Sequence, residues 1–141
     1  MKTSLIDMND FVNTDIYSVI SNASFNTCTL KDKIFSGSLL KNNSFTNVTF
    51  KNCVFFASDL EKTEFIGCKF INCQFQFVNS RSCEFSSCKF ENTVWVQGST
   101  LYNHLSNCEM DLATTQHFGK GNNRIHNCHA TDMFNINNLA N

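Results

Sequence analysis

Large apolar residues recur at every fifth position along most of this chain. Between residues 20 and 95, fifteen of the sixteen positions in this series are large and apolar. A period of five matches neither the 3.6-residue period of a helix nor the two-residue period of a simple strand. It predicts a backbone that turns once per pentapeptide, which is a solenoid. The series is Ile20, Phe25, Leu30, Phe35, Leu40, Phe45, Phe50, Phe55, Leu60, Phe65, Phe70, Phe75, Ser80, Phe85, Phe90 and Trp95.

A second series lies two residues before the first and carries mostly small or medium side chains. All eight cysteines fall on this phase: Cys28, Cys53, Cys68, Cys73, Cys83, Cys88, Cys108 and Cys128. Sorting the large residues by a period of twenty gives four columns, three mostly aromatic and one aliphatic. One column is Phe25, Phe45, Phe65 and Phe85. Stacked side chains of neighbouring coils should resemble each other, so the pattern predicts four pentapeptides per coil.

The segments NASFNTCTL, FTNVTFKNCVF and FIGCKFINCQF make this chain resemble the pentapeptide-repeat family. The unit of that family has Leu or Phe at its centre and a small residue two positions earlier. The resemblance covers about residues 18–97 and implies an all-β fold, a right-handed quadrilateral parallel β-helix with capping segments at both ends. The chain departs from the family in having few Asn or Asp residues just before the centre. That position faces outward, so the departure affects surface chemistry more than the fold.

The pattern divides the chain into three segments. Residues 1–19 are predicted to form an N-terminal cap, and residues 20–116 the β-helix, with a degenerate fifth coil over 98–116. The stretch HFGKGNN, from His117 to Asn123, is predicted to be a loop because Gly119 and Gly121 free the backbone. Residues 117–141 are predicted to be this loop and a C-terminal cap or dimer contact. The candidate contact residues are Met133, Phe134, Ile136 and Leu139, and the family resemblance implies a homodimer through this end.

Ser80 interrupts the aliphatic column of the predicted core. Buried hydroxyls are usually hydrogen-bonded, so the first interpretation is a tolerated core hydroxyl with a backbone partner. The alternative is a local bulge that forms a binding notch.

Composition excludes several classes of protein. The formal net charge is −1, which argues against a basic nucleic-acid binder and against a strongly acidic tail. Aromatic residues make up 13% of the chain, so disorder of its bulk is not expected. No run of 18 apolar residues and no apolar signal region occurs, which predicts neither a membrane span nor a secretory signal.

The cysteines are predicted to be buried free thiols. Stacked side chains point the same way, so the Cβ atoms of neighbouring coils stay about 4.8 Å apart, beyond the usual ~3.8 Å of a disulfide. Free thiols imply a reducing, cytoplasmic compartment, with export by a dedicated secretion system left open. A metal site is the alternative for a cluster near the C-terminus, although no metal or other cofactor is predicted. Its members are His104, Cys108, His126, Cys128 and His129.

No catalytic motif is present, and no enzymatic activity is predicted. The sequence has no G-x-S-x-G elbow, Walker loop, dinucleotide fingerprint or H-E-x-x-H motif. The carboxylates of the repeat lie at outward phases beside lysines and are interpreted as a solvated mixed surface. They are Asp59, Glu61, Glu64, Glu84 and Glu91.

The absence of a catalytic motif beside a strongly specified scaffold favours a non-enzymatic protein-binding module of a bacterium or phage. The resemblance offers two alternatives. One is a DNA mimic that modulates a type II topoisomerase and protects gyrase from quinolones or toxins, and the other is a secreted effector or phage protein that targets a host protein. A duplex mimic should be acidic, whereas residues 20–95 carry eight basic and six acidic side chains.

Apolar residues at outward phases are the candidates for a protein-contact surface, since exposed apolar patches often mark contacts. Packing between coils on the outer face is the alternative explanation. Direct contact with nucleic acid or membrane is not expected. The candidates are Phe56, Ile66, Ile71 and Phe77, with Ile34, Leu39 and Val54 as further outliers.

Overall fold

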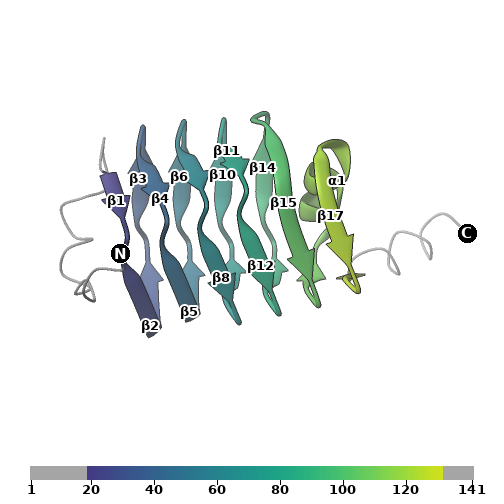
Figure 1. Ribbon diagram of the computed structural model, residues 1–141, viewed down its shortest axis with the longest axis horizontal. Helices are drawn as coiled ribbons and strands as arrows, with labels where there is room; N and C mark the ends of the chain where they lie inside the picture. Colours follow the sequence, from purple (N-terminus) through teal and green to yellow (C-terminus); the bar gives the residue numbers. More distant parts are fainter. Residues whose placement is uncertain (1–18, 132–141) are drawn as a thin grey trace, which may run out of the picture.

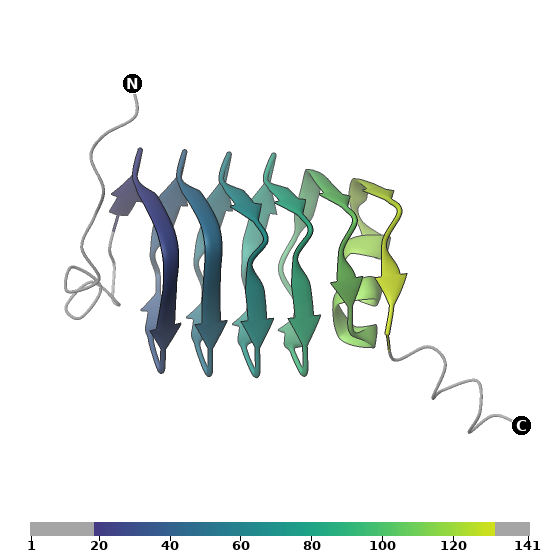
Figure 2. The same ribbon diagram turned by 90° about the horizontal axis from the view of Figure 1, so that it is seen from below.

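The computed structural model describes residues 19–131, and they form a parallel β-solenoid with one short helix. Figure 1 shows the coils side by side along a rod, with β1 near one end and β17 and the helix α1 near the other. The rod turned by 90° shows the same stack of coils (Figure 2). The predicted all-β solenoid is confirmed. The predicted N-terminal cap lies outside the described residues, apart from Val19 at the start of β1. No helix of the described part is long and apolar enough to cross a membrane.

Each coil has four sides, and each side is a stack of parallel strands. The first side holds β1 (Val19–Ser21), β4 (Leu39–Lys41), β7 (Asp59–Glu61), β11 (Asn79–Arg81) and the beginning of β15 (Thr100–Ser106). The second side holds the first halves of β2 (Ser24–Lys31) and β5 (Ser44–Lys51), then β8 (Glu64–Ile66), β12 (Glu84–Ser86), the end of β15 and β17 (Asn122–His126). Six strands therefore stack on this side.

The third side holds the second halves of β2 and β5, then β9 (Lys69–Ile71), β13 (Lys89–Glu91), β16 (Glu109–Met110) and β18 (His129–Ala130). The fourth side is a separate four-stranded sheet of β3 (Ile34–Ser36), β6 (Val54–Phe56), β10 (Gln74–Gln76) and β14 (Val94–Val96). Strands of neighbouring coils pair with a register of twenty residues, for example Phe50 with Phe70. The predicted four pentapeptides per coil are confirmed.

Columns of stacked aromatic rings form the core. The rings of Phe50 and Phe70 lie 4.8 Å apart and nearly parallel, and Phe70 repeats this contact with Phe90. Within one coil the rings meet edge to face, as Phe65 and Phe70 do at 5.4 Å. These four Phe side chains are almost completely buried. Each ring therefore contacts the coil before, the coil after and its neighbour in its own coil.

The corner residues between the sides have left-handed backbone angles. Almost every corner from Asn22 to Asn127 has a φ between 47° and 62°. Asn and Gly adopt this conformation more readily than other residues, because the Asn side chain bonds locally and Gly has no Cβ. The requirement explains part of the Asn-rich composition. Asn stands at corners 22, 42, 47, 52, 72, 92, 107 and 127.

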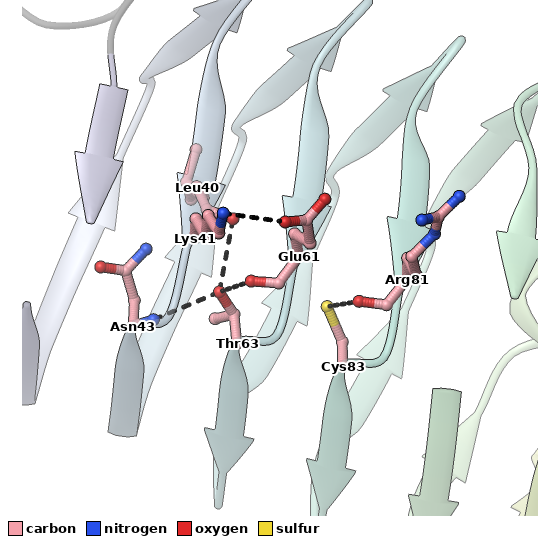
Figure 3. Close-up of polar contacts among 7 residues, drawn as sticks. All are labelled: Leu40, Lys41, Asn43, Glu61, Thr63, Arg81 and Cys83. Atoms are coloured by element: carbon pink, nitrogen blue, oxygen red, sulfur yellow. Dashed lines mark hydrogen bonds and ion pairs between the residues drawn. The ribbon is translucent and has the colours of Figure 1, made fainter. Parts of the chain in front are cut away.

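Many of the small inward residues donate a hydrogen bond to the neighbouring coil, whereas Ala23, Val48 and Val78 at the same phase have no donor group. The Thr63 hydroxyl lies 3.4 Å from the carbonyl oxygen of Leu40 and 3.0 Å from that of Glu61 (Figure 3). The thiols of Cys73 and Cys88 lie 3.2 and 3.1 Å from the carbonyl oxygens of Phe50 and Phe65. All eight cysteines are free, and six of them are buried as predicted, whereas Cys28 and Cys128 near the two ends of the rod are only half-buried. They were expected to act only as small apolar groups, but most of them also satisfy carbonyl groups beside the core.

The fifth coil ends in a helix in place of a fourth strand. Helix α1 (Leu112–Lys120) begins at Asp111, whose side chain accepts a hydrogen bond from the Thr114 amide as an N-cap. The expected loop over His117 to Asn123 is therefore wrong, since residues up to Lys120 are helical and β17 begins at Asn122. The physical reason lies in burial. Phe118 is 1% exposed and its ring packs against Phe85 and Trp95, so the helix closes the end of the aromatic core.

Ser80 is buried and hydrogen-bonded, as the first interpretation expected, although its hydroxyl binds side chains and not the backbone. Its oxygen lies 3.3 Å from the Thr100 hydroxyl and accepts a bond from Asn103 Nδ2 at 3.2 Å. Asn103 Nδ2 also lies 2.9 Å from the side-chain oxygen of Asn123 in β17. The aliphatic column thus becomes a polar network toward the C-terminal end.

Candidate functional site

The outer surface of the four-stranded sheet carries no ionisable side chain. Two residues of each strand point outward, and they are Ile34, Ser36, Val54, Phe56, Gln74, Gln76, Val94 and Val96. Ile34 and Val94 are 49% and 45% exposed, and Phe56 is 40% exposed. We call these eight residues together with the corner residue Phe77 the apolar face. Five of the eight residues and Phe77 are apolar, although Gln74 and Gln76 of β10 lie between the apolar residues of β6 and those of β14. Exposed apolar side chains are costly to hydrate, so this face is the strongest candidate for a contact surface in the described part of the chain.

Phe77 adds a large exposed ring to the apolar face. It lies at a corner with a φ of 55°, in the column where neighbouring coils have Gly37 and Ala57. Bulky residues rarely adopt this backbone conformation, and the side chain is nevertheless 47% exposed. Its ring meets the ring of Phe56 edge to face at 5.7 Å. Phe77 therefore costs the fold backbone energy without filling the core.

The predicted contact residues lie on different sides of the solenoid. Phe56 and Phe77 lie together, and the outliers Ile34 and Val54 lie on the same face. Ile66 ends β8 on the second side and is 40% exposed, whereas Ile71 ends β9 on the third side and is half-buried. Leu39 lies in β4 on the first side. Only the first group forms a continuous surface.

The other three sides carry charges of both signs. Lys41, Glu61 and Arg81 occupy the same position in successive coils, so charges alternate along the first side. Lys41 Nζ and Glu61 Oε1 lie 3.5 Å apart, and the three side chains are visible in Figure 3. Lys89 and Glu91 form a similar exposed pair on the third side. Exposed ion pairs contribute little stability but keep these sides well hydrated.

Helix α1 and the corner between β14 and β15 form a second distinctive region of the surface. Trp95 Nε1 donates a hydrogen bond to the Thr114 hydroxyl at 2.9 Å. The Thr93 hydroxyl donates to the buried Asp111 carboxylate at 2.8 Å, so Thr114 is the donor in its 2.9 Å bond with Thr93. This chain of bonds fixes the first turn of the helix against the fourth coil. It places His117 with its ring stacked on Trp95 at 4.3 Å.

His117 is 8% exposed, and its Nε2 atom is the one fully buried side-chain nitrogen or oxygen in residues 19–131 without a hydrogen-bond partner. Burial, reinforced by the Lys120 ammonium group, lowers the pKa of His117 to about 4. The imidazole is therefore neutral near pH 7. An unsatisfied buried polar atom is rare in folded proteins and calls for a physical explanation.

The candidate metal cluster is not assembled among the described residues. No group of three or more His, Cys, Asp and Glu side chains in residues 19–131 could hold a metal ion. His104 pairs in register with Arg124, and Cys108 lies below Cys128 in the stack. His126 and His129 are exposed. The predicted oligomer contacts Met133, Phe134, Ile136 and Leu139 lie outside the described residues.

The buried thiols do not share one protonation behaviour. Burial raises the pKa of the Cys83 thiol to about 11, so this group is protonated near neutral pH. Hydrogen bonding with the Cys88 thiol instead lowers the pKa of the Cys108 thiol to about 7. The outward carboxylates named from the sequence lie on separate sides of the coil. Asp59 and Glu61 are on the first side, whereas Glu64 and Glu84 are stacked on the second and Glu91 is on the third.

The comparison with solved structures gives remote likenesses. One is to QnrB1, a plasmid-mediated fluoroquinolone resistance protein, with a TM-score of 0.39 and 11% identity over 79% of this chain and 69% of that chain. Another is to a putative glycosyl hydrolase from Parabacteroides merdae, with a TM-score of 0.29 and 10% identity over 83% of this chain and 76% of that one. Neither is close enough to carry an argument about function. No protein-family model and no curated protein matches the sequence.

The sequence pattern did not single out Trp95, His117 and Lys120 as neighbours. The helix that joins these residues interrupts the five-residue period. The available signal was Asp111 followed by Leu112 and Ala113, an N-cap residue before good helix formers. Gly121 directly after the helix is the matching stop signal.

Proposed function

We propose that this protein is a non-enzymatic scaffold of the pentapeptide-repeat type that binds another protein through the apolar face. The observation that carries the proposal is the complete absence of ionisable side chains from the outer surface of β3, β6, β10 and β14. Interface centres are depleted in charge and enriched in aromatic residues. Phe56 and Phe77 supply such an aromatic centre, and Val94 and Val96 lie beyond the Gln residues of β10, toward the C-terminal end.

The backbone at Phe77 supports this assignment independently. A corner with a φ of 55° favours Asn or Gly, so Phe77→Asn should leave the free energy of unfolding unchanged or raise it slightly. If Phe77 serves a partner, the same substitution should weaken binding. Binding is then expected to weaken with no loss of stability, which no purely structural role of the ring would produce.

The test is crosslinking and affinity capture from cells that make the protein, with paired variants. Phe56→Glu on the apolar face is matched by Ile66→Glu on the second side, since both side chains are 40% exposed. Phe77→Asn is matched by Tyr102→Asn, since Tyr102 is another exposed aromatic residue at a corner, with a φ of 60°. We expect the captured protein to be lost with Phe56→Glu and Phe77→Asn and retained with the two controls.

Two results would contradict the proposal. One is that no protein is captured by the unchanged chain. The other is that Ile66→Glu and Phe56→Glu reduce capture equally, because the contact would then not be confined to the apolar face. A topoisomerase-directed mimic remains the less favoured alternative, since the sides outside the apolar face mix both signs of charge and do not resemble a polyanion.

A further inference from the structure

A pocket of about 360 Å³ lies where helix α1 meets the turn between β14 and β15. Trp95, Ser99, Gln116, His117 and Lys120 are among the residues that line it. This volume lies within the usual range for small-molecule sites, about 300–1,000 Å³. The pocket is a feature of the broken repeat, because the regular coils have a strand where the helix stands.

The backbone holds the walls of the pocket in place. Gly98 has a φ of 86°, and a Cβ atom there would lie 2.2 Å from the carbonyl oxygen of Val78. A Cβ atom at Gly121 would lie 2.1 Å from the carbonyl oxygen of Thr100. Both glycines line the pocket, and each allows the chain to pack directly on a neighbouring strand. This makes the pocket largely preformed.

The His117 ring forms part of the pocket wall, and its Nε2 atom is enclosed and unpartnered. A half-turn of an imidazole about its Cβ–Cγ bond keeps the ring plane and exchanges the two ring edges. The stack on Trp95 survives that rotation, because it depends only on the plane. His117 can thus present a nitrogen to a ligand without rearrangement of the helix.

The charged and apolar residues that line the pocket indicate the class of ligand that fits it. Lys120 is the one cationic side chain of the lining, and no Asp or Glu contributes to it. Leu101, Ala113 and the edge of Trp95 supply apolar surface, because both faces of the Trp95 ring are already covered by Phe75 and His117. Gln116 and Ser99 add hydrogen-bonding groups. An anionic group attached to a small apolar body matches this combination.

We propose that the pocket binds a small organic carboxylate, held by Lys120 Nζ and a ring nitrogen of His117, with its apolar part against Leu101 and Ala113. The proposal is independent of the protein-binding role of the apolar face. It gives an imidazole nitrogen of His117 a partner after the half-turn of the ring, since Nε2 is enclosed as the ring stands. It also accounts for a lysine with no acidic residue beside it in the pocket lining.

The test uses the purified full chain and a panel of acids, each paired with its uncharged amide: acetate, isovalerate, benzoate and phenylacetate. Trp95 is the sole tryptophan of the chain, so its fluorescence reports this pocket alone. We expect at least one acid to produce a saturable change and to bind about tenfold more tightly than its amide, as a charge-assisted hydrogen bond would give.

Two variants locate the binding. Lys120→Met should weaken the acid about tenfold and leave the amide unchanged, while Lys69→Gln, on the third side, should change neither. His117→Phe keeps a ring to stack on Trp95 and removes both nitrogens, and it should weaken the acid as well. The proposal is overturned if no acid gives saturable binding, if acids and amides bind equally, or if Lys120→Met binds as tightly as the unchanged protein.

Discussion

The C-terminal end over residues 97–131 differs from the regular coils between Ile20 and Trp95 in its side chains, although most of its strand pairs keep the twenty-residue register. In the regular coils the inward positions repeat large apolar and small donor residues, so each coil is a template for the next. In the C-terminal end Thr100 stands in the large-residue column and bonds to Asn103 in the small-residue column, and a helix replaces the fourth strand. The register continues past the helix, since Leu105 still pairs with Ile125.

This difference shows where a repetitive fold acquires unique sites. A position inside a regular coil has equivalents above and below it, so its side chain sees nearly the same surroundings in each coil. Distinct chemistry appears only where the repeat departs from its rule. Phe77 is such a departure at a corner, and His117 is another at the helix.

The largest effect is expected from truncating a ring in the middle of a column. Phe70 stacks on Phe50 and Phe90, both at 4.8 Å, and meets Phe65 and Phe75 of its own coil edge to face. Phe70→Ala should lower the free energy of unfolding in urea by about 4 kcal/mol. Phe118→Ala should cost less, since Phe118 covers the core from one end. A larger loss for Phe118→Ala would contradict the contrast between regular coils and cap.

The second-largest loss of stability is expected at the N-terminus of helix α1. The Asp111 carboxylate accepts bonds from the Thr93 amide and hydroxyl and from the Thr114 amide. Asp111→Ala should lower the free energy of unfolding by about 3 kcal/mol, because it removes an N-cap and leaves buried donors unpaired. Thermal and urea unfolding measure this loss. Asp111→Asn keeps an acceptor oxygen and serves as the control, and an equal loss in both variants would show that capping is not the cause.

A smaller loss in the free energy of unfolding is expected at acid pH, and it arises at His117 in the C-terminal end. The pKa of His117 is lowered from an ordinary 6.5 to about 4, so between these values the unfolded chain binds a proton that the folded protein does not. The stability that neutral His117 contributes is therefore fully present above pH 6.5, and it is lost as the pH falls toward 4. Its size is about 2 kcal/mol.

The measurement is the free energy of unfolding at pH 7 and pH 4.5 for the unchanged protein, His117→Phe and His126→Gln. His117→Phe should reduce the acid-induced loss, while His126→Gln, an exposed residue of β17, should not. An identical pH dependence in all three proteins would show that His117 is not buried as a neutral group.

The smallest effect concerns the donor role of the inward cysteines. Cys73→Ala removes the bond to the Phe50 carbonyl and should cost about 1 kcal/mol, while Cys73→Ser keeps a donor and should cost less. Ser58 already makes the equivalent bond to Phe35 at 3.0 Å in the neighbouring coil. Urea unfolding of the two variants shows whether the Cys73 thiol stabilises the fold as a hydrogen-bond donor. If Cys73→Ala is the more stable of the two, the thiol acts only as an apolar filler.

How much could be predicted from the sequence differs between the two regions for a physical reason. The series from Ile20 to Trp95 is long enough for its period to determine the backbone, so the solenoid, its four-strand coils and the free thiols followed from it. The helix after Asp111 depends on one cap residue and on the burial of Phe118, and a single local signal is easily masked by a periodic search. The predicted contact residues were separated by side only in the structure, because sequence spacing alone did not show which of them share a face.

The most direct test of the central claim is site-specific photocrosslinking at two positions of equal exposure. A photoreactive phenylalanine analogue replaces Phe56 in one protein and Ile66 in another, since both residues are 40% exposed and lie on different sides of the solenoid. If the apolar face binds a partner, irradiation in the producing cells should yield a discrete protein adduct from position 56 and none from position 66. The absence of an adduct at position 56, or the same adduct from both positions, would contradict the account.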